Sequence, residues 1–298
     1  MKNLKIAPAV LTYYSKGNRE ERADLLAVES PLEIRLSFGS KDSREHRTLS
    51  ITMRTPGDDL ELAVGYLFGE GIISTKSDIK SIRFCKDVRE AHRREEGETT
   101  ILVELMPEVR VDTAHFSRNV YTNSSCGVCG KTNFSTLFAD SLIYDAPPVS
   151  SLVPIDILQT LPQKLREQQA VFARTGGLHA AALFDLKGEL LTLREDIGRH
   201  NALDKLIGAA LYKDNLPLHQ SVILLSGRIG YELVEKAVVA RVAILAAIGA
   251  PSSLAVETAQ ENDLTLIGFL RPSSFNCYSN PERLAKNIHS QNEPDKKA

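Results

Sequence analysis

The chain has 298 residues, enough for a well-buried core and about two domains. Acidic and basic residues nearly cancel, 38 against 36, so the bulk charge does not indicate a nucleic-acid polymer or an anionic membrane as partner. The sequence has no run of about 18 apolar residues, the length that a membrane-spanning helix needs, and residues 1–8 lack the apolar stretch of a secretory signal. Four cysteines in so long a chain argue against a disulfide framework, so we expect a reducing cytoplasm.

The N-terminal half is predicted to be rich in strands. Apolar residues alternate with polar ones in several segments, the pattern of half-buried strands. The predicted strands are 32–38, 49–53, 79–84 and 101–105. A turn at 55–59 precedes apolar residues spaced for one helical face over 60–68. The charged run at 89–98 is interpreted as a solvated hairpin tip or loop.

The composition changes at 145–151, which contains two prolines and predicts a boundary. We expect a β-rich region over 1–150, ending in a Cys-x-x-Cys loop and a following helix, and an α/β domain over 151–298. Helical patterns alternate there with short apolar runs, which predicts helices that cover a largely buried sheet. The expected helices are 154–169, 202–211 and 233–242; the expected strands are 179–184, 189–193, 222–225, 254–256 and 264–270, the first two as a hairpin.

Cysteine chemistry is indicated by Cys126 and Cys129, which lie in the small, polar, glycine-flanked segment Cys126-Gly127-Val128-Cys129-Gly130. A loop that leads into a helix start, with Lys131 nearby, favours the reactive thiolate. A structural zinc site needs four ligands, but Cys85 and Cys277 are isolated and no His-x-x-x-His pair exists, so no metal site is expected. A thioredoxin-type role is disfavoured because the motif does not follow a strand of an N-terminal βαβ unit and the chain has no tryptophan.

Three polar loops are expected where ligands gather in α/β sheets, at the carboxyl ends of strands. They are 194–201, 226–230 and 269–276. The third combines an arginine, two hydroxyls and two aromatic rings, a mixture suited to a nucleotide. For each loop taken alone, helix capping and ion pairing stay open as an equal explanation.

Five segments together resemble the FdhD family of sulfur carriers, which are needed to activate formate dehydrogenase. The segments, in family order, are Ser124–Gly130, Thr175–Ala181, Arg194–Ala202, Leu225–Arg228 and Ile267–Arg271, and the resemblance covers about 28–283. It implies a cytidine-deaminase-like layered α/β fold for the C-terminal domain, beside the β-rich N-terminal domain. It also implies a homodimer that binds the bis(molybdopterin guanine dinucleotide) molybdenum cofactor and transfers sulfur to it from a cysteine desulfurase.

The resemblance makes Cys126 the persulfide-bearing residue, with Cys129 as a helper that resolves the persulfide or relays its sulfur. A passive role for Cys129 stays open, because free cysteine often behaves as a small hydrophobe. The guanine nucleotide is expected at Phe269, Leu270, Arg271, Pro272, Ser273 and Ser274. Cys85 and Cys277 are interpreted as structural, and His179 and His200 as either donors to phosphate or sulfur or structural side chains.

Two further functions are alternatives to sulfur transfer. Zinc deaminases carry His-x-Glu and Pro-Cys-x-x-Cys at two helix starts. The corresponding loops here hold Arg199-His200-Asn201 and Ser226-Gly227-Arg228, so the metal ligands and the catalytic glutamate are missing and no deamination is expected. The other alternative is a non-catalytic cofactor chaperone, which would bind the guanine dinucleotide through the same loops without thiol chemistry.

Overall fold

The computed structural model describes residues 5–85, 99–111 and 152–285, which group into two compact units. The first unit comprises the described residues of Met1–Ile143, Gln169–Ala180 and Arg194–Asn215, and the second those of Tyr144–Gln168, Ala181–Leu193 and Leu216–Ala298. The predicted boundary at 150–151 lies outside the described residues and stays a prediction, as do the loop at 89–98 and the linker at 145–151.

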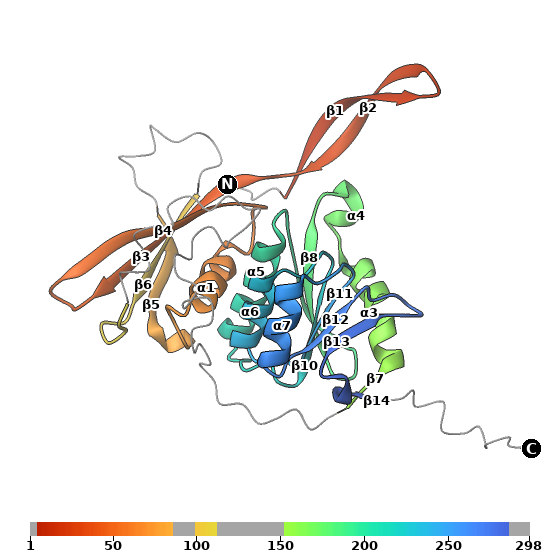
Figure 1. Cartoon of the computed structure of the whole chain (residues 1–298). Coiled ribbons are helices and arrows are strands. Elements are labelled where there is room, and N and C mark those ends of the chain that lie inside the picture. Colours follow the sequence, from red (N-terminus) through yellow and green to blue (C-terminus); the bar gives the residue numbers. More distant parts are fainter. Residues whose placement is uncertain (1–4, 86–98, 112–151, 286–298) are drawn as a thin grey trace, which may run out of the picture. The chain divides into compact units, whose positions relative to one another are not determined.

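The first unit contains a two-stranded hairpin and a four-stranded sheet (Figure 1). The hairpin joins β1 (Ile6–Ser15) to β2 (Asn18–Ala27) and was not predicted. The sheet has the order β4-β3-β6-β5, with bounds β3 Ser30–Gly39, β4 Arg44–Arg54, β5 Ile79–Phe84 and β6 Thr99–Leu105. Alternate residues of β3 and β6, among them Leu32, Ile34 and Val103, are fully buried. The four strands predicted by alternation are therefore confirmed.

Two helices of the first unit pack in backbone contact. Helix α1 (Asp59–Gly69) confirms the predicted helix, and α5 (Arg199–Tyr212) starts three residues before its predicted stripe. A Cβ at Gly65 would lie 1.9 Å from the Asp204 carbonyl oxygen, and one at Gly208 would lie 2.0 Å from that of Glu61. Only glycine permits the two helix backbones to approach this closely, and the contact fixes α5 against α1. A 3-10 turn, η1 (Lys76–Asp78), and the short helix α4 (Phe172–Thr175) complete the unit.

The second unit is built on a six-stranded sheet of order β13-β12-β11-β10-β8-β9. Strands β10, β11 and β12 are parallel and every residue in them is buried, while β8 and β13 pair antiparallel to this centre. The bounds are β8 His179–Asp185, β9 Leu190–Asp196, β10 Ser221–Leu225, β11 Ile244–Ala247, β12 Thr265–Gly268 and β13 Asn276–Ser279. The predicted hairpin at β8 and β9 is confirmed.

Helices flank this sheet on both sides. Figure 1 shows α6 (Tyr231–Val239) and α7 (Ser253–Glu261) on one side and α3 (Ile155–Gln168) on the other. Strand β7 (Val153–Pro154) pairs separately with β14 (Leu284–Ala285), which follows the 3-10 turn η4 (Pro281–Arg283). The chain is therefore a mixed α/β protein, as expected, and in its described part no helix is both long and apolar enough to cross a membrane.

In the second unit the strand predicted at 254–256 is wrong, and strands β11 and β13 of the six-stranded sheet were not predicted. Residues 254–256 belong to α7, whose N-cap Ser252 accepts a hydrogen bond from the Ala255 amide at 3.3 Å. The buried positions Ala255, Thr258 and Ala259 follow a helical period, which a three-residue apolar run does not reveal. Strand β11 was missed because its four apolar residues directly continue the apolar stripe predicted as helix over 233–242.

Candidate functional site

The loops after the parallel strands of the second unit are tied together by their backbones. The Gly249 amide donates to the Gly227 carbonyl at 3.0 Å, and the Phe269 amide donates to the Gly249 carbonyl at 3.0 Å. The segments after β10, β11 and β12 thus meet at the carboxyl edge of the sheet. Two of the predicted loops, 226–230 and 269–276, are brought together there by a third segment, 248–251.

Segment 248–251 was missed at the sequence level although it holds the other two loops in place. A Cβ at Gly249 would lie 2.6 Å from the Gly227 carbonyl oxygen, and one at Gly268 would lie 2.8 Å from Pro251 Cδ. Side chains at these positions would push the loops apart. The signal that could have found the segment is the Gly249-Ala250-Pro251 break after the apolar run of β11.

Arg271 is held at this edge by main-chain oxygens. Its Nη1 donates to the Ile248 carbonyl at 2.8 Å and to the Leu270 carbonyl at 2.9 Å, while its own amide donates to the Ser274 carbonyl at 2.8 Å. The side chain is exposed and no other described residue pairs with it. Because a guanidinium has five donor hydrogens, Nε and Nη2 remain available to an anion.

Phe269, two residues before Arg271, has an unusual backbone conformation. Its φ is 54°, in the left-handed region that a bulky residue rarely adopts, and its side chain is 43% exposed. Ser273, Ser274 and Arg228 are also exposed or half-exposed on these loops. An aromatic face, hydroxyls and two arginines on joined loops are suited to a nucleotide with its phosphates.

The predicted loop 194–201 belongs to the first unit, where most of its polar side chains have structural partners. The Arg194 guanidinium forms a two-pronged ion pair with Glu61, at 2.5 and 2.8 Å. Glu195 accepts hydrogen bonds from the amides of Val171 and Phe172, at 3.0 and 2.8 Å. For Arg194 and Glu195 the capping and ion-pairing explanation therefore holds.

Asp196 and Lys205 form a completely buried ion pair, with 2.7 Å between Lys205 Nζ and Asp196 Oδ2. Lys205 also donates to the Thr55 carbonyl at 2.8 Å, and Asp196 accepts from the Thr55 amide at 3.1 Å. Asn201 donates to Asp196 Oδ1 at 3.0 Å and to the Met53 carbonyl at 2.8 Å. This network joins the end of β9, the first turns of α5 and the connection between β4 and α1.

The two candidate histidines lie near this network. Burial, and then the positive charge of Arg199, hold the pKa of His179 below its usual range, with Asp196 acting weakly in the opposite direction. His179 therefore favours the neutral imidazole. His200 lies in the first turn of α5 and has interactions of its own. The catalytic or structural roles of both residues stay predictions.

The candidate sulfur-carrying residues Cys126 and Cys129 lie outside the described residues. Cys85 and Cys277 are described, and both are half-buried free thiols. The Cys277 Sγ donates to the Ser279 carbonyl at 3.2 Å, and burial raises the pKa of this thiol. Because the thiolate is the reactive form, the surroundings of Cys277 disfavour nucleophilic chemistry.

Comparison with known proteins gives full-length similarities. The chain is 48% identical over 274 residues to a sulfur carrier protein FdhD of Streptomyces coelicolor, covering 90% of this chain and 92% of that protein. It is 40% identical over 283 residues to a sulfur carrier protein FdhD of Sulfolobus acidocaldarius, covering 94% of this chain and 99% of that protein.

A crystal structure of a protein from Desulfotalea psychrophila, assigned to the formate dehydrogenase accessory proteins, matches with a TM-score of 0.68. The match covers 95% of this chain and 100% of that one at 22% identity, so it supports the fold. The sequence model of the FdhD/NarQ family matches residues 27–285. The chain therefore belongs to the FdhD/NarQ family.

Proposed function

We propose that this chain is a sulfur carrier that serves a formate dehydrogenase. It takes sulfur from a cysteine desulfurase onto Cys126 and delivers it to the bis(molybdopterin guanine dinucleotide) molybdenum cofactor, which is its substrate. The observation that carries the proposal is the 48% identity, over 90% of the chain, to a relative named as a sulfur carrier protein. Thiol chemistry of this kind needs a reducing compartment, for which we propose the cytoplasm.

The proposed loading step is an exchange between two sulfur atoms. The Cys126 thiolate attacks the outer sulfur of the desulfurase persulfide, a new S–S bond forms at Cys126, and the desulfurase cysteine leaves as a thiolate. No electrons are gained or lost overall. In the delivery step, Cys129 attacks the inner sulfur of the Cys126 persulfide. This attack releases hydrosulfide to the molybdenum cofactor and leaves a Cys126–Cys129 disulfide, which an external thiol must reduce.

We place the guanine nucleotide end of the substrate on the loops at the carboxyl edge of the six-stranded sheet. The support is the anchored, exposed Arg271 next to the exposed ring of Phe269. We also propose that the layering of this unit is of the cytidine-deaminase type, since an antiparallel hairpin, β8-β9, adjoins three parallel strands.

GDP, a partial mimic of the substrate, is expected to bind this chain and to raise its thermal stability by mass action. Arg271→Ala should weaken GDP binding by about 1.5–3 kcal/mol, the scale of a charge-assisted hydrogen bond. Titration calorimetry measures the difference. Lys187→Ala, which removes an exposed cation from the turn between β8 and β9, controls for non-specific attraction of phosphate. Equal GDP affinity in Arg271→Ala and the wild type would place the nucleotide elsewhere.

Cys129→Ser is expected to accept sulfur at the normal rate but to pass it on slowly. An adjacent thiolate attacks intramolecularly at high effective concentration, and the serine hydroxyl is too weakly acidic to replace it. Persulfide should therefore accumulate on the variant while activation of formate dehydrogenase falls. Intact-mass spectra and client activity, recorded on the same samples, measure the two effects. Wild-type loading and activation in this variant would mean that Cys126 works without Cys129.

A further inference from the structure

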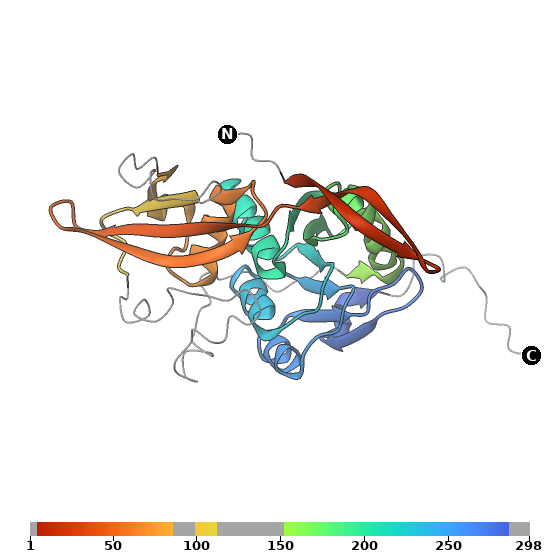
Figure 2. The ribbon, with the colours of Figure 1, turned by 90° about the horizontal axis from the view of Figure 1, so that it is seen from above.

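Arg199 carries a positive charge that no described residue neutralises. It is the first residue of α5, the teal helix in Figure 2, and its side chain is half-buried. The Arg199 Nε atom is buried without a hydrogen-bond partner, and none of the described residues forms an ion pair with the guanidinium. A buried donor without a partner is costly and rare in folded proteins. The state of Arg199 therefore indicates an anionic partner that the described part of the chain does not supply.

The position of Arg199 in the helix makes the missing partner more costly. The N-terminus of a helix has a partial positive charge, which favours acidic residues nearby and disfavours basic ones. The first turn of α5 contains no acidic residue, and its N-cap residue is Gly198, which has no side chain. Nothing in the first turn of α5 therefore balances the charge of Arg199.

The acidic residue that precedes α5, Asp196, is already bound by other groups. Its Oδ2 atom forms the buried ion pair with Lys205 Nζ at 2.7 Å. Its Oδ1 atom accepts from the Gly198 amide at 2.8 Å and from Asn201 Nδ2 at 3.0 Å. The negative charge of Asp196 thus compensates the buried lysine, and Arg199 still lacks an anion.

His179 adds a neutral donor near Arg199. Burial, and then the positive charge of Arg199, lower the pKa of His179, so its imidazole is neutral at pH 7 and close enough to be affected by the guanidinium. The ring is half-buried, and the structure gives it no hydrogen-bond partner among the described residues. A neutral imidazole has one N–H to donate, and a guanidinium has five. Together they suit a small oxyanion, which accepts several hydrogen bonds.

We propose that Arg199 and His179 bind a phosphate group, with the guanidinium as its charged partner and the imidazole as a neutral donor. A phosphate group carries about −1.5 to −2 charges at pH 7, enough to balance both Arg199 and the positive end of α5. Both residues belong to the first unit, whereas the nucleotide loops belong to the second. Free phosphate and a phosphate monoester share this chemistry, and two probes distinguish them. The proposal does not depend on sulfur transfer.

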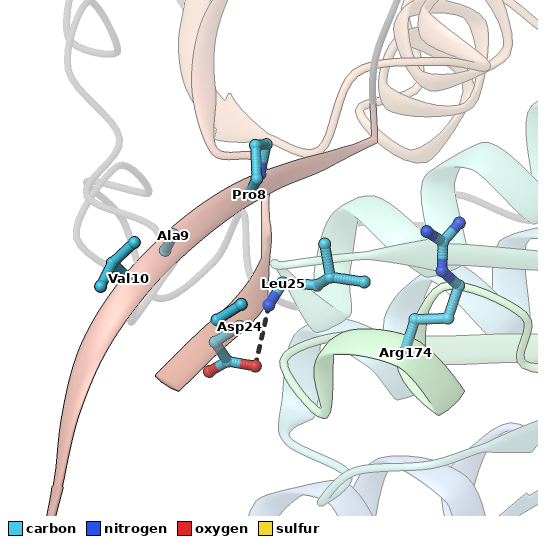
Figure 3. Close-up of a pocket in the computed structure, with 7 residues that line it drawn as sticks. Pro8, Ala9, Val10, Asp24, Leu25 and Arg174 are labelled. Atoms are coloured by element: carbon cyan, nitrogen blue, oxygen red, sulfur yellow. Dashed lines mark hydrogen bonds between the residues drawn. The ribbon is translucent and has the colours of Figure 1, made fainter. Parts of the chain in front are cut away.

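Arg174, another arginine of the first unit, provides the matched control. It lies in α4 and lines a cavity of about 640 Å³, together with Val10, Asp24 and Leu25 among others (Figure 3). The Arg174 side chain is exposed, so water solvates its charge. Apolar groups and a carboxylate line the cavity beside it, and both disfavour an anion. Arg174→Met therefore removes the same charge without removing the proposed site.

Thermal unfolding of the full chain, with inorganic phosphate added at constant ionic strength, tests the proposal. A ligand that binds only the folded chain raises the Tm by mass action, and the concentration dependence gives the affinity. Arg199→Met should lower the affinity for phosphate about tenfold or more, the loss expected for a charge-assisted contact, whereas Arg174→Met should bind like the wild type. Ribose 5-phosphate is the second probe. Tighter binding than that of phosphate would identify a monoester as the ligand, and weaker binding would identify the free anion.

The stability of the phosphate-free chain separates a binding role of Arg199 from a structural one. Arg199→Met keeps an apolar stem and removes an uncompensated charge, so without phosphate it should unfold at the same denaturant concentration as the wild type or a higher one. Phosphate should also raise the pKa of His179, measured by NMR, in the wild type but not in Arg199→Met, because a nearby anion favours the imidazolium.

Four results would each overturn the proposal. They are a wild-type chain that does not bind phosphate, equal phosphate affinity in Arg199→Met and the wild type, an equal loss of affinity in Arg174→Met, and a phosphate-free Arg199→Met that is less stable than the wild type. The last result would show that Arg199 has a structural partner within the chain.

Discussion

Lys205→Met is expected to lower the free energy of unfolding by about 3–5 kcal/mol, because it leaves the buried carboxylate of Asp196 without its charged partner. Chemical denaturation followed by circular dichroism measures this loss. Lys80→Met is the matched control: Lys80 pairs with Glu104 over the same 2.7 Å, but the Lys80 side chain is 55% exposed. An exposed pair of this kind contributes up to about 1 kcal/mol.

A double variant separates the ion pair from the packing around it. Lys205→Met together with Asp196→Asn removes both charges, so the double variant should lose less stability than the sum of the two single variants. Two results would contradict the role of this ion pair in holding together β9, α5 and the connection from β4 to α1. One is equal destabilisation by Lys205→Met and Lys80→Met. The other is a stability loss in the double variant that equals the sum of the losses in Lys205→Met and Asp196→Asn.

Cys126→Ala is expected to reduce activation of formate dehydrogenase to the level found without the carrier, because the alanine side chain has no sulfur to form a persulfide. Client activity measured after maturation with each variant shows the effect. Cys85→Ala and Cys277→Ala are the matched controls and should keep activation near the wild-type rate. The Cys277 thiol has a raised pKa, and both cysteines are half-buried.

The same experiment decides between a sulfur carrier and a non-catalytic cofactor chaperone. A chaperone would bind the guanine dinucleotide without using a thiol, so its Cys126→Ala variant would still activate the client. GDP binding should be intact in Cys126→Ala under both hypotheses. Measuring GDP binding alongside client activity therefore shows whether a loss of activation comes from the missing thiol or from a damaged nucleotide site.

Strands and helices whose own residues show a clear apolar period were predictable from the sequence. Alternation gave β3 and β6, and helical spacing gave α1 and α5, because each element shows its buried face in its own residues. Strand β11 was missed, since a fully buried strand has no polar face and continues the apolar stripe of α6. The contact between Gly65 and Gly208 depends on two helices about 140 positions apart, which no local pattern encodes.

The candidate site was predictable only in part, because local sequence patterns show some of its residues but not their contacts with distant segments. Residues 269–276 combine groups that suit a nucleotide, and their position after β12 follows from the order of strands and helices. The role of segment 248–251 was hidden because it acts through backbone atoms. In the loop 194–201, Asp196 resembles a ligand-binding residue in sequence, yet its partners Lys205 and Thr55 come from a helix and from a distant connection.

Intact-mass spectrometry after incubation with a cysteine desulfurase and cysteine tests the central claim most directly. The wild-type chain should gain one sulfur atom that a reductant removes, because the Cys126 thiolate accepts the outer sulfur of the desulfurase persulfide. Cys126→Ser should gain none, while Cys277→Ser should gain sulfur as the wild type does. A reductant-sensitive sulfur that persists unchanged in Cys126→Ser would contradict the assignment of Cys126 as the sulfur-carrying residue.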